Sequence, residues 1–558
     1  VGSFEGIKPG DRYFYKIDNE LDRPDPASMF QPDGVHGPSG VINRSFNWTD
    51  QNWKGLEMQD LIIYELHVGT FTQNGTFEGV IEKLDYLSAL GITAIEIMPV
   101  GQFPGERNWG YDGVYPYAVQ NSYGGPEGLK KLVDAAHKAG IAVILDVVYN
   151  HLGPDGNYLR EFGPYFTDKY KTPWGDALNY DGQYCDGVRN FFHQNALMWL
   201  EEFHVDGLRM DAVHAIWDFS ALHFMQELKE AVQKLEQKLG RKKVLIAELD
   251  LNNVRYINPV EKGGYGLDGQ WIDEFHHALH SVLTGETDGY YEDFGKMDHL
   301  KRAFKDTYVY NGVFSPHRKK IFGTTLTDNP YSQFVVFAQN HDHIGNRPLG
   351  DRLTQTLSFE QLKLAAATYI LSPYVPLLFM GEEYGEKNPF LYFVDHNEEL
   401  SKLVSEGRKK EFGYFKFKDE FPDPSTKASF EKSVLSWNLE ENSPLLNFYN
   451  ALIALRKTHP AYKSSERGSL QLVETQQDEL IALEKSSDEA KLLIVLNFSK
   501  EPGIFGPLSG DSKIIFHSED EKWGGKVKGT ALTNTDRITV NGYSVVVYEI
   551  PGAQGTLF

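Results

Sequence analysis

Three short apolar runs of this chain carry a carboxylate at or near their carboxyl ends. FHVDGLRMD ends at Asp211, KVLIAELD contains Glu248, and FVVFAQNHD ends at Asp342. Runs of this length and composition are typical of buried parallel strands, and ligand-binding groups gather where such strands end. Because burying an unpaired carboxylate is costly, a purely structural protein gains nothing from three of them. Cleavage of an acetal needs a nucleophile, a proton donor and a partner that holds charge, so these acids predict glycoside chemistry.

Arg209 gives Asp211 a reason to be the ionised acid. The two residues are two positions apart, which places their side chains on the same side of a strand. A guanidinium beside a carboxylate lowers the pKa of that carboxyl and holds it ionised, as a nucleophile requires. The alternative is a structural ion pair, and a position at the active end of a barrel strand favours the catalytic interpretation.

Glu248 is the candidate proton donor. It lies in an apolar run, where burial raises the pKa of a carboxyl group and suits it to general-acid work. Asp250 lies two residues further on, on the same side of the predicted strand, and the spacing does not separate these two candidates.

The run that ends at Asp342 also carries Asn340 and His341, and Asp342 is a candidate for binding sugar hydroxyls and distorting the ring. His341 and His343 flank it, but neither an HExxH pattern nor a cysteine partner accompanies them. We therefore expect a hydrogen-bonding cluster and predict no metal site.

Further polar and aromatic residues near predicted strand ends are candidate substrate-binding residues: Trp109, Tyr111, Asp146, His151, Trp271, Asp273 and Glu274. Tyr111, in the glycine-flanked loop NWGYDG, is a plausible stacking platform, and its loop position weakens the alternative of core packing. Asp273 precedes EFHHALH, so capping a helix is an equal alternative to a substrate role for it.

The elements that must position these residues form a repeating strand–helix pattern. The predicted strands are 61–68, 92–100, 141–151, 205–213, 244–250, 267–273, 334–342 and 376–385. Amphipathic segments such as 125–140 and 219–240 lie between most of them. Eight such units without a glycine-rich phosphate turn predict an α/β fold, a (β/α)₈ TIM barrel rather than a doubly wound sheet.

The flanking segments predict further domains. We expect residues 1–50 to hold a partial, truncated β-sandwich domain and a Pro/Gly-rich linker, and residues 51–460 to form the catalytic barrel. An insertion at 152–190, rich in aromatics including Trp174, is expected to roof the active face. Short alternating runs in residues 461–558 predict a C-terminal antiparallel β domain.

Composition limits the classes of molecule that we expect this protein to bind. The 558 residues carry a net charge of −23, which disfavours nucleic acid and anionic membranes and leaves neutral polyols acceptable. Cys185 is the only cysteine, so internal disulfides and cysteine-based metal clusters are excluded. We find neither a signal-peptide pattern nor an apolar run of membrane length, and we expect a soluble cytoplasmic protein without a cofactor. The oligomeric state is left open.

In this order, DVVYNH, GLRMDAVHAI, IAELD and QNHD resemble the four signature regions of the α-amylase superfamily, glycoside hydrolase family 13. The resemblance implies that Asp211 is the nucleophile, Glu248 rather than Asp250 the general acid/base, and Asp342 the transition-state stabiliser. The positions that it implies around the cleaved sugar are Tyr111, Asp146, His151, Arg209 and His341, and His214 in the second region is a further substrate-binding candidate.

A closer resemblance is to the maltooligosyltrehalose trehalohydrolases, a branch of this superfamily. It is carried by YELHVGTFTQNGTFEG, RNWGYDGV, WIDEFHHALHSVLTGE and LLFMGEEYGEKNPFLYFVDH, and it covers residues 10–440. It implies a retaining hydrolase that cuts maltooligosyltrehalose, or a related α-glucan, and releases trehalose. Leu249 stands where the family has Ser, and His343 where it has Gln. The alternatives are a glycogen-branching or debranching enzyme and a non-catalytic glucan-binding protein.

Overall fold

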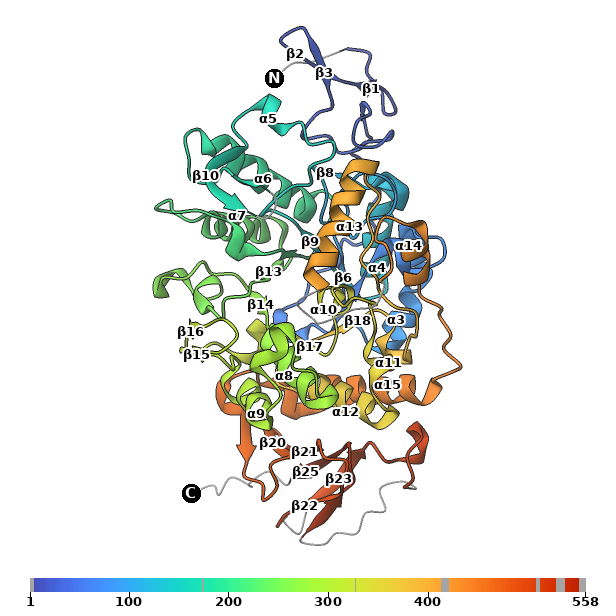
Figure 1. The fold of residues 1–558 in the computed structure, drawn as a ribbon, viewed down its shortest axis with the longest axis vertical. Helices are drawn as coiled ribbons and strands as arrows, with labels where there is room; N and C mark the ends of the chain where they lie inside the picture. Colours follow the sequence, from blue (N-terminus) through green and yellow to red (C-terminus); the bar gives the residue numbers. More distant parts are fainter. Residues whose placement is uncertain are drawn as a thin grey trace.

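A closed barrel of eight parallel strands forms the middle of the molecule in this computed structural model (Figure 1). The structure describes residues 5–172, 175–326, 328–412, 421–507, 512–527 and 537–550, so Trp174 lies outside the described residues. The strands are β5 (Ile63–Leu66), β6 (Ala94–Ile97), β9 (Ala142–Val147), β12 (Gly207–Met210), β13 (Val244–Ala247), β14 (Gly269–Trp271), β17 (Phe334–Phe337) and β18 (Val375–Phe379). They pair in chain order, and β18 closes the barrel against β5. The predicted TIM barrel is confirmed.

Alternation along each strand divides the apolar residues between the barrel interior and the layer beneath the helices. Ile63, Ala94 and Ile144 belong to the interior cluster, whereas Tyr64 and Leu66, for example, pack outside it. The side chain two positions after an interior residue returns to the interior, nearer the carboxyl end of the strand. The same alternation brings four charged side chains inward at that end: Glu65, Glu96, Asp146 and Arg209. Glu65 is paired in register with Glu96, and Arg209 with Asp146.

Helices cover the outside of the barrel. The two amphipathic segments expected to be helical form α4 (Gly125–Lys138) and α7 (Phe224–Leu239). Other helices used below are α6 (Cys185–Glu201), α8 (Asp273–Thr284), α10 (His341–Gly345), α12 (Phe359–Ile370), α13 (Glu398–Phe412) and α15 (Ser443–Thr458). α7 ends at Gly240 with φ 62°, a left-handed conformation that glycine adopts without strain.

Short antiparallel pairs lie at the N-terminal end and over one side of the barrel. Residues 5–50 contain β1 (Arg12–Tyr13) paired with β4 (Ser39–Gly40), and the hairpin of β2 (Tyr15–Ile17) with β3 (Leu21–Arg23). Between β9 and α6, β10 (Phe166–Thr172) pairs with β11 (Gly175–Leu178). The aromatic-rich insertion therefore contains a hairpin that follows the carboxyl end of a barrel strand.

The C-terminal residues form an antiparallel sheet below the barrel, at the opposite end from the N-terminal ribbons (Figure 1). Its strands are, in spatial order, β19 (Leu470–Val473), β20 (Leu480–Ser486), β21 (Lys491–Asn497), β25 (Ser544–Ile550) and β23 (Lys513–His517), and β22 (Gly503–Phe505) pairs separately with β24 (Ile538–Val540). This confirms the predicted C-terminal antiparallel strands. α12 joins the two layers, because Lys363 Nζ donates to the carbonyl of Ser518 at 2.7 Å.

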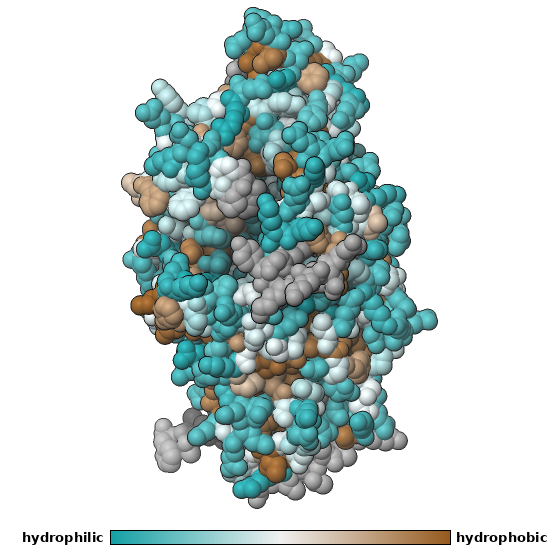
Figure 2. Space-filling model, viewed as in Figure 1, coloured by the Kyte–Doolittle hydropathy of each residue, from teal (hydrophilic) through white to brown (hydrophobic). Residues whose placement is uncertain are grey.

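The visible face of the molecule is predominantly hydrophilic, with hydrophobic side chains in separate small patches (Figure 2). None of the helices in the described part of the chain combines the length and apolar character needed to cross a bilayer.

Candidate active site

Arg209 links three carboxylates at the carboxyl end of the barrel. Its Nη1 donates to both oxygens of Asp146, at 3.0 and 2.8 Å, and to Asp211 Oδ1 at 2.9 Å. Its Nη2 lies 3.7 Å from Glu248 Oε2. The Arg209 side chain is 2% exposed, so these charges act on one another with little screening by water. The parallel barrel thus brings residues of β9, β12 and β13 to one cation.

Asp211 and Glu248 have opposite pKa shifts. Burial raises the pKa of Asp211, but Arg209, His151 and a hydrogen bond from Asn150 Nδ2 at 2.7 Å outweigh it, so the net pKa is lowered. For Glu248, burial and the charges of Asp211 and Asp342 outweigh Arg209 and raise the pKa to about 7. The pair therefore combines a carboxylate that favours its ionised form with a carboxyl group that favours holding a proton.

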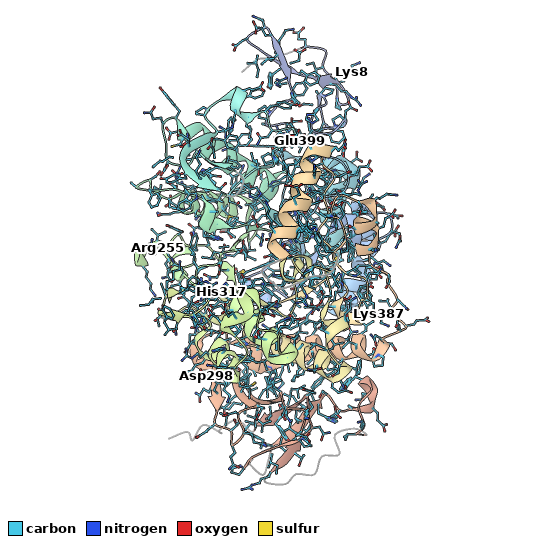
Figure 3. The ribbon with its side chains drawn as sticks, viewed as in Figure 1. Lys8, Arg255, Asp298, His317, Lys387 and Glu399 are labelled. Carbon is cyan, nitrogen blue, oxygen red and sulfur yellow. The ribbon has the colours of Figure 1, made fainter. Side chains whose placement is uncertain are left out.

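The two remaining strand-end acids differ in exposure and partners. Asp342 is exposed, and its Oδ1 accepts a hydrogen bond from Asn346 at 2.5 Å. Asp250 is 56% exposed at its side chain and pairs with Arg318 instead of with Arg209. The residue before Arg318 in the sequence, His317, is labelled in Figure 3. Glu248 therefore occupies the position beside Arg209 that the spacing alone left open between the two acids.

A chain of hydrogen bonds runs from Glu65 to Asp146 beneath the acids. Glu65 Oε2 accepts from the backbone N–H of His341 at 2.9 Å, and Glu65 Oε1 lies 2.5 Å from His341 Nδ1. His341 Nε2 lies 2.8 Å from the Tyr111 hydroxyl, which lies 2.7 Å from Asp146 Oδ2. The Tyr111 hydroxyl has one hydrogen and cannot donate to both neighbours.

Both contacts of the Tyr111 hydroxyl are satisfied when one additional proton lies on His341 or on Asp146. In the first case the imidazolium donates to Tyr111, which donates to ionised Asp146; in the second, protonated Asp146 donates to Tyr111, which donates to neutral His341. Burial lowers the pKa of His341, but the charge of Glu65 and the hydrogen bond to it outweigh burial and raise the pKa. Burial raises the pKa of Asp146 to about 6, with Arg209 opposing it.

Glu65 and Asn150 are site residues that the sequence reasoning missed. The sequence does contain a signal for Glu65, because it is the lone acid in the apolar run LIIYELHV. Burying it is as costly as burying Asp211, Glu248 or Asp342. Glu96 has the same signal, and both of its carboxyl oxygens are buried without a hydrogen-bond partner among the described residues. Burial, with the charge of Glu65, raises the pKa of Glu96 well above the ordinary value, which favours its neutral form.

The two predicted tryptophans lie under the site. Trp271 is 2% exposed, and the Arg209 guanidinium lies 4.4 Å from its ring centroid, so it supports the cation from within the barrel. Trp109 is 4% exposed and meets His341 edge-on at 5.7 Å. Trp271 therefore contacts the site through Arg209 and Trp109 through His341, and neither ring presents an exposed face to a substrate.

The remaining candidate substrate-binding residues differ in their burial and their partners. His151 Nε2 lies 3.0 Å from the carbonyl of Tyr111. His214, in the turn Val213–Ala215 after Asp211, is partly buried. Asp273 begins α8 but makes no cap, since the N-cap is Ile272, and burial with the charges of Glu248, Asp250 and Asp342 raises its pKa well above the ordinary value.

The structure does not bring Glu274 to this face. It is 3% exposed, and its Oε2 accepts hydrogen bonds from the backbone N–H groups of Val309 and Tyr310 at 2.7 and 2.9 Å. Successive helical residues point about 100° apart, so Asp273 and Glu274 face different sides of α8. Glu274 thus anchors the Val309–Tyr310 backbone to α8, and its predicted substrate contact stays a prediction.

No set of three or more His, Cys, Asp or Glu side chains suited to a metal ion occurs within the described ranges. The imidazoles near Asp342 make hydrogen bonds instead; His343 Nδ1, for example, lies 2.8 Å from Asn340 Oδ1.

Known proteins share this arrangement of elements. A family model described as the α-amylase catalytic domain matches residues 41–174. The malto-oligosyltrehalose trehalohydrolase of Saccharolobus solfataricus is 52% identical over 82% of this chain and 79% of its own length, and that of Arthrobacter ramosus is 46% identical over 80% and 79%. The crystal structure of a putative α-amylase from Salmonella typhimurium is 38% identical with a TM-score of 0.87, over 98% of this chain and 91% of that one.

Proposed function

Because the chain belongs to the malto-oligosyltrehalose trehalohydrolase family, we propose that it hydrolyses the α-1,4 bond next to the terminal trehalose unit of maltooligosyltrehalose. The products are trehalose and a maltooligosaccharide. One observation carries the proposal: Asp211 and Glu248 both lie beside Arg209, and the pKa of Asp211 is lowered whereas that of Glu248 is raised. A branching or debranching enzyme is not favoured, because the trehalohydrolases match most of the chain at 46–52% identity.

In the proposed reaction, Asp211 attacks the anomeric carbon while the bond from that carbon to the leaving oxygen breaks. Glu248 gives its proton to the leaving oxygen, and a glycosyl–Asp211 ester forms. Glu248, now ionised, takes a proton from water as the water oxygen attacks the anomeric carbon and the ester bond breaks, which restores both acids. This double displacement retains configuration and requires the two carboxyl groups to lie roughly 5–5.5 Å apart.

The proposed roles of the other residues follow from their positions. Asp342, exposed in the first turn of α10, the helix that follows β17, binds sugar hydroxyls and stabilises the transition state. Tyr111, Asp146, His151, His214, Asp273 and His341 are the proposed substrate-binding residues. Arg209 keeps Asp211 ionised, and Trp109 and Trp271 position His341 and Arg209 from below. The reaction needs no cofactor.

The decisive experiment is incubation with maltooligosyltrehalose, with a plain maltooligosaccharide as the control substrate, followed by product analysis. We expect release of free trehalose from the first and far slower cleavage of the second. Cleavage of the control alone would identify an α-amylase, and new α-1,6 linkages would identify a branching enzyme; either outcome contradicts the proposal.

We also propose that the enzyme works in trehalose formation in the cytoplasm, which suits a chain with the single free cysteine Cys185. The proposed catalytic unit is residues 51–460, flanked by an N-terminal unit at 1–50 and a C-terminal unit at 461–558, with the insertion at 152–190. Limited proteolysis that cuts first near these boundaries would support this division, and first cuts within barrel strands would contradict it.

A further inference from the structure

The exposed side chains of Trp217 and Phe219 and the half-buried Tyr170 form an aromatic group that the proposed reaction does not use; we call it the aromatic platform. Trp217 is 38% exposed and Phe219 74%. The ring of Tyr170 stacks on Trp217 with centroids 5.5 Å apart and planes at 17°, and its centroid lies 6.0 Å from that of Phe219. Clustered exposed aromatic rings mark binding surfaces, since water solvates them poorly.

The platform is held in place by a buried acid. Asp181, whose side chain is 3% exposed, accepts hydrogen bonds from the Tyr170 hydroxyl at 2.6 Å and from the backbone N–H of Phe219 at 3.2 Å. Lys169 Nζ also lies 2.9 Å from Asp181, which offsets its charge. This joins hairpin β10–β11 to the segment that follows β12. A ring set that is fixed before binding loses little conformational entropy when a ligand stacks on it.

The platform continues the proposed catalytic face. Its two segments follow the carboxyl ends of β9 and β12, the strands that carry Asp146 and Asp211. Trp217 lies six residues after Asp211, so the two Cα atoms are at most about 21 Å apart even for a fully extended chain. The 3₁₀ turn Val213–Ala215 shortens this distance. A linear oligosaccharide with one bond at Asp211 is therefore able to reach the platform.

We propose that the aromatic platform is a distal subsite that binds the linear α-1,4-glucan chain of the substrate, with Trp217 and Phe219 stacking on the apolar C–H faces of glucosyl units. The inference rests on the proposed function and adds a determinant of chain-length preference. Tyr170 is the support, because Trp217 stacks on its ring and Lys169 Nζ lies 4.8 Å from its centroid. A neutral ligand fits these rings, because the neighbouring cation Lys169 is already paired with Asp181 and the protein has a net charge of −23.

The test compares long and short substrates in Trp217→Ala and Phe219→Ala. We expect the KM for trehalose carrying five further glucosyl units to rise about five- to thirty-fold, and the KM for trehalose carrying one to rise far less, because only the longer chain reaches the platform. Trp217→Phe keeps a ring and should recover most of the affinity. Asp181→Asn, which loosens the support, should shift the KM ratio in the same direction.

The matched control is Phe14→Ala, an exposed aromatic residue on the N-terminal ribbons that should leave both KM values unchanged. Direct calorimetric titration with maltoheptaose and maltose, in an Asp211→Asn background that cannot turn over, separates binding from catalysis. If the enzyme releases no trehalose but Trp217→Ala still loses affinity for maltoheptaose, the proposed function fails and the subsite stands. Normal trehalose release with equal maltoheptaose affinity in wild type and Trp217→Ala overturns the subsite, as does a change in oligomeric state without a change in sugar affinity.

Discussion

At the scale of single residues, the site is a set of carboxyl groups kept in different protonation states by one cation and one hydrogen-bond chain. Asp211 is ionised because Arg209, His151 and Asn150 outweigh its burial, whereas Glu248 meets two negative charges and keeps a proton up to about pH 7. Glu65 holds His341 from below through two contacts. Each group's role depends on its neighbours more than on its residue type.

Replacing Glu248 by Gln removes the transferable proton while preserving the side-chain shape. General-acid catalysis contributes roughly 10²- to 10⁴-fold, so we expect kcat to fall by about that factor. In the wild type, kcat should fall as the pH rises through about 7, because Glu248 loses its proton there. Glu248→Gln should lose this limb of the pH–rate profile. An unchanged profile, or retained activity with an unchanged unfolding curve, would contradict the role of Glu248.

Replacing Glu65 by Gln tests its action through His341. The change removes the negative charge that raises the pKa of His341, so that pKa should fall, and kcat/KM should drop by about 10- to 100-fold for the loss of charged hydrogen bonds. The pKa of the His341 imidazole is measurable by NMR. Glu96→Gln is the matched control, because burial raises the pKa of Glu96 and favours its neutral form, and the amide has the same shape. Equal effects of both substitutions would show that Glu65 is merely structural.

At the scale of elements, alternation in the strands and amphipathicity in the helices made the barrel predictable. The side of a helix that a polar residue faces was harder to predict, as Asp273 and Glu274 show. α8 and α10 together bury five histidines, and four of them have no carboxylate that outweighs their burial: His276, His277, His280 and His343. Burial lowers the pKa of each, and that of His343 to about 4. The interface between these helices is therefore built for neutral imidazoles.

This interface predicts loss of stability in acid. The unfolded chain binds a proton at each of these histidines near pH 6.5, whereas folded His343 does so only near pH 4, so the free energy of unfolding should fall as the pH drops from 6.5 to 4. His343→Gln should remove about 2 kcal/mol of the loss between pH 7 and pH 5. Urea unfolding at both pH values measures this, and an identical loss in His343→Gln would refute it.

At the scale of the whole molecule, the C-terminal sheet is joined to the barrel by an aromatic contact. Trp523 stacks on Phe516 with centroids 5.1 Å apart, and it meets Phe448 of α15 edge-on at 5.8 Å. The contact lies on the barrel's outer helices, away from the carboxylates at the strand ends. The sheet is therefore coupled to the stability of the barrel and not to its chemistry.

Trp523→Ala should consequently separate stability from activity. We expect the free energy of unfolding to fall by about 3–5 kcal/mol, the usual cost of removing a buried Trp. kcat/KM at 25 °C should stay within about twofold of the wild-type value, because ground-state contacts at the site are untouched. Ile504→Ala, at an exposed position of the same domain, should change neither quantity. A large loss of kcat/KM in the folded Trp523→Ala enzyme would contradict the separation.

The sequence by itself determined the barrel strands, the ends at which Asp211, Glu248 and Asp342 stand, and the pairing of Arg209 with Asp211 on one side of a strand. These features are local: alternation and short spacings act within a few residues, where the backbone period dictates direction. Only the tertiary structure decided which residues meet across the barrel. Glu65 contacts a histidine 276 positions away, Tyr111 bridges to Asp146, and Asp250 pairs with Arg318 while Glu248 lies beside Arg209. A pKa depends on distances to such neighbours and on burial, and neither is set by local spacing.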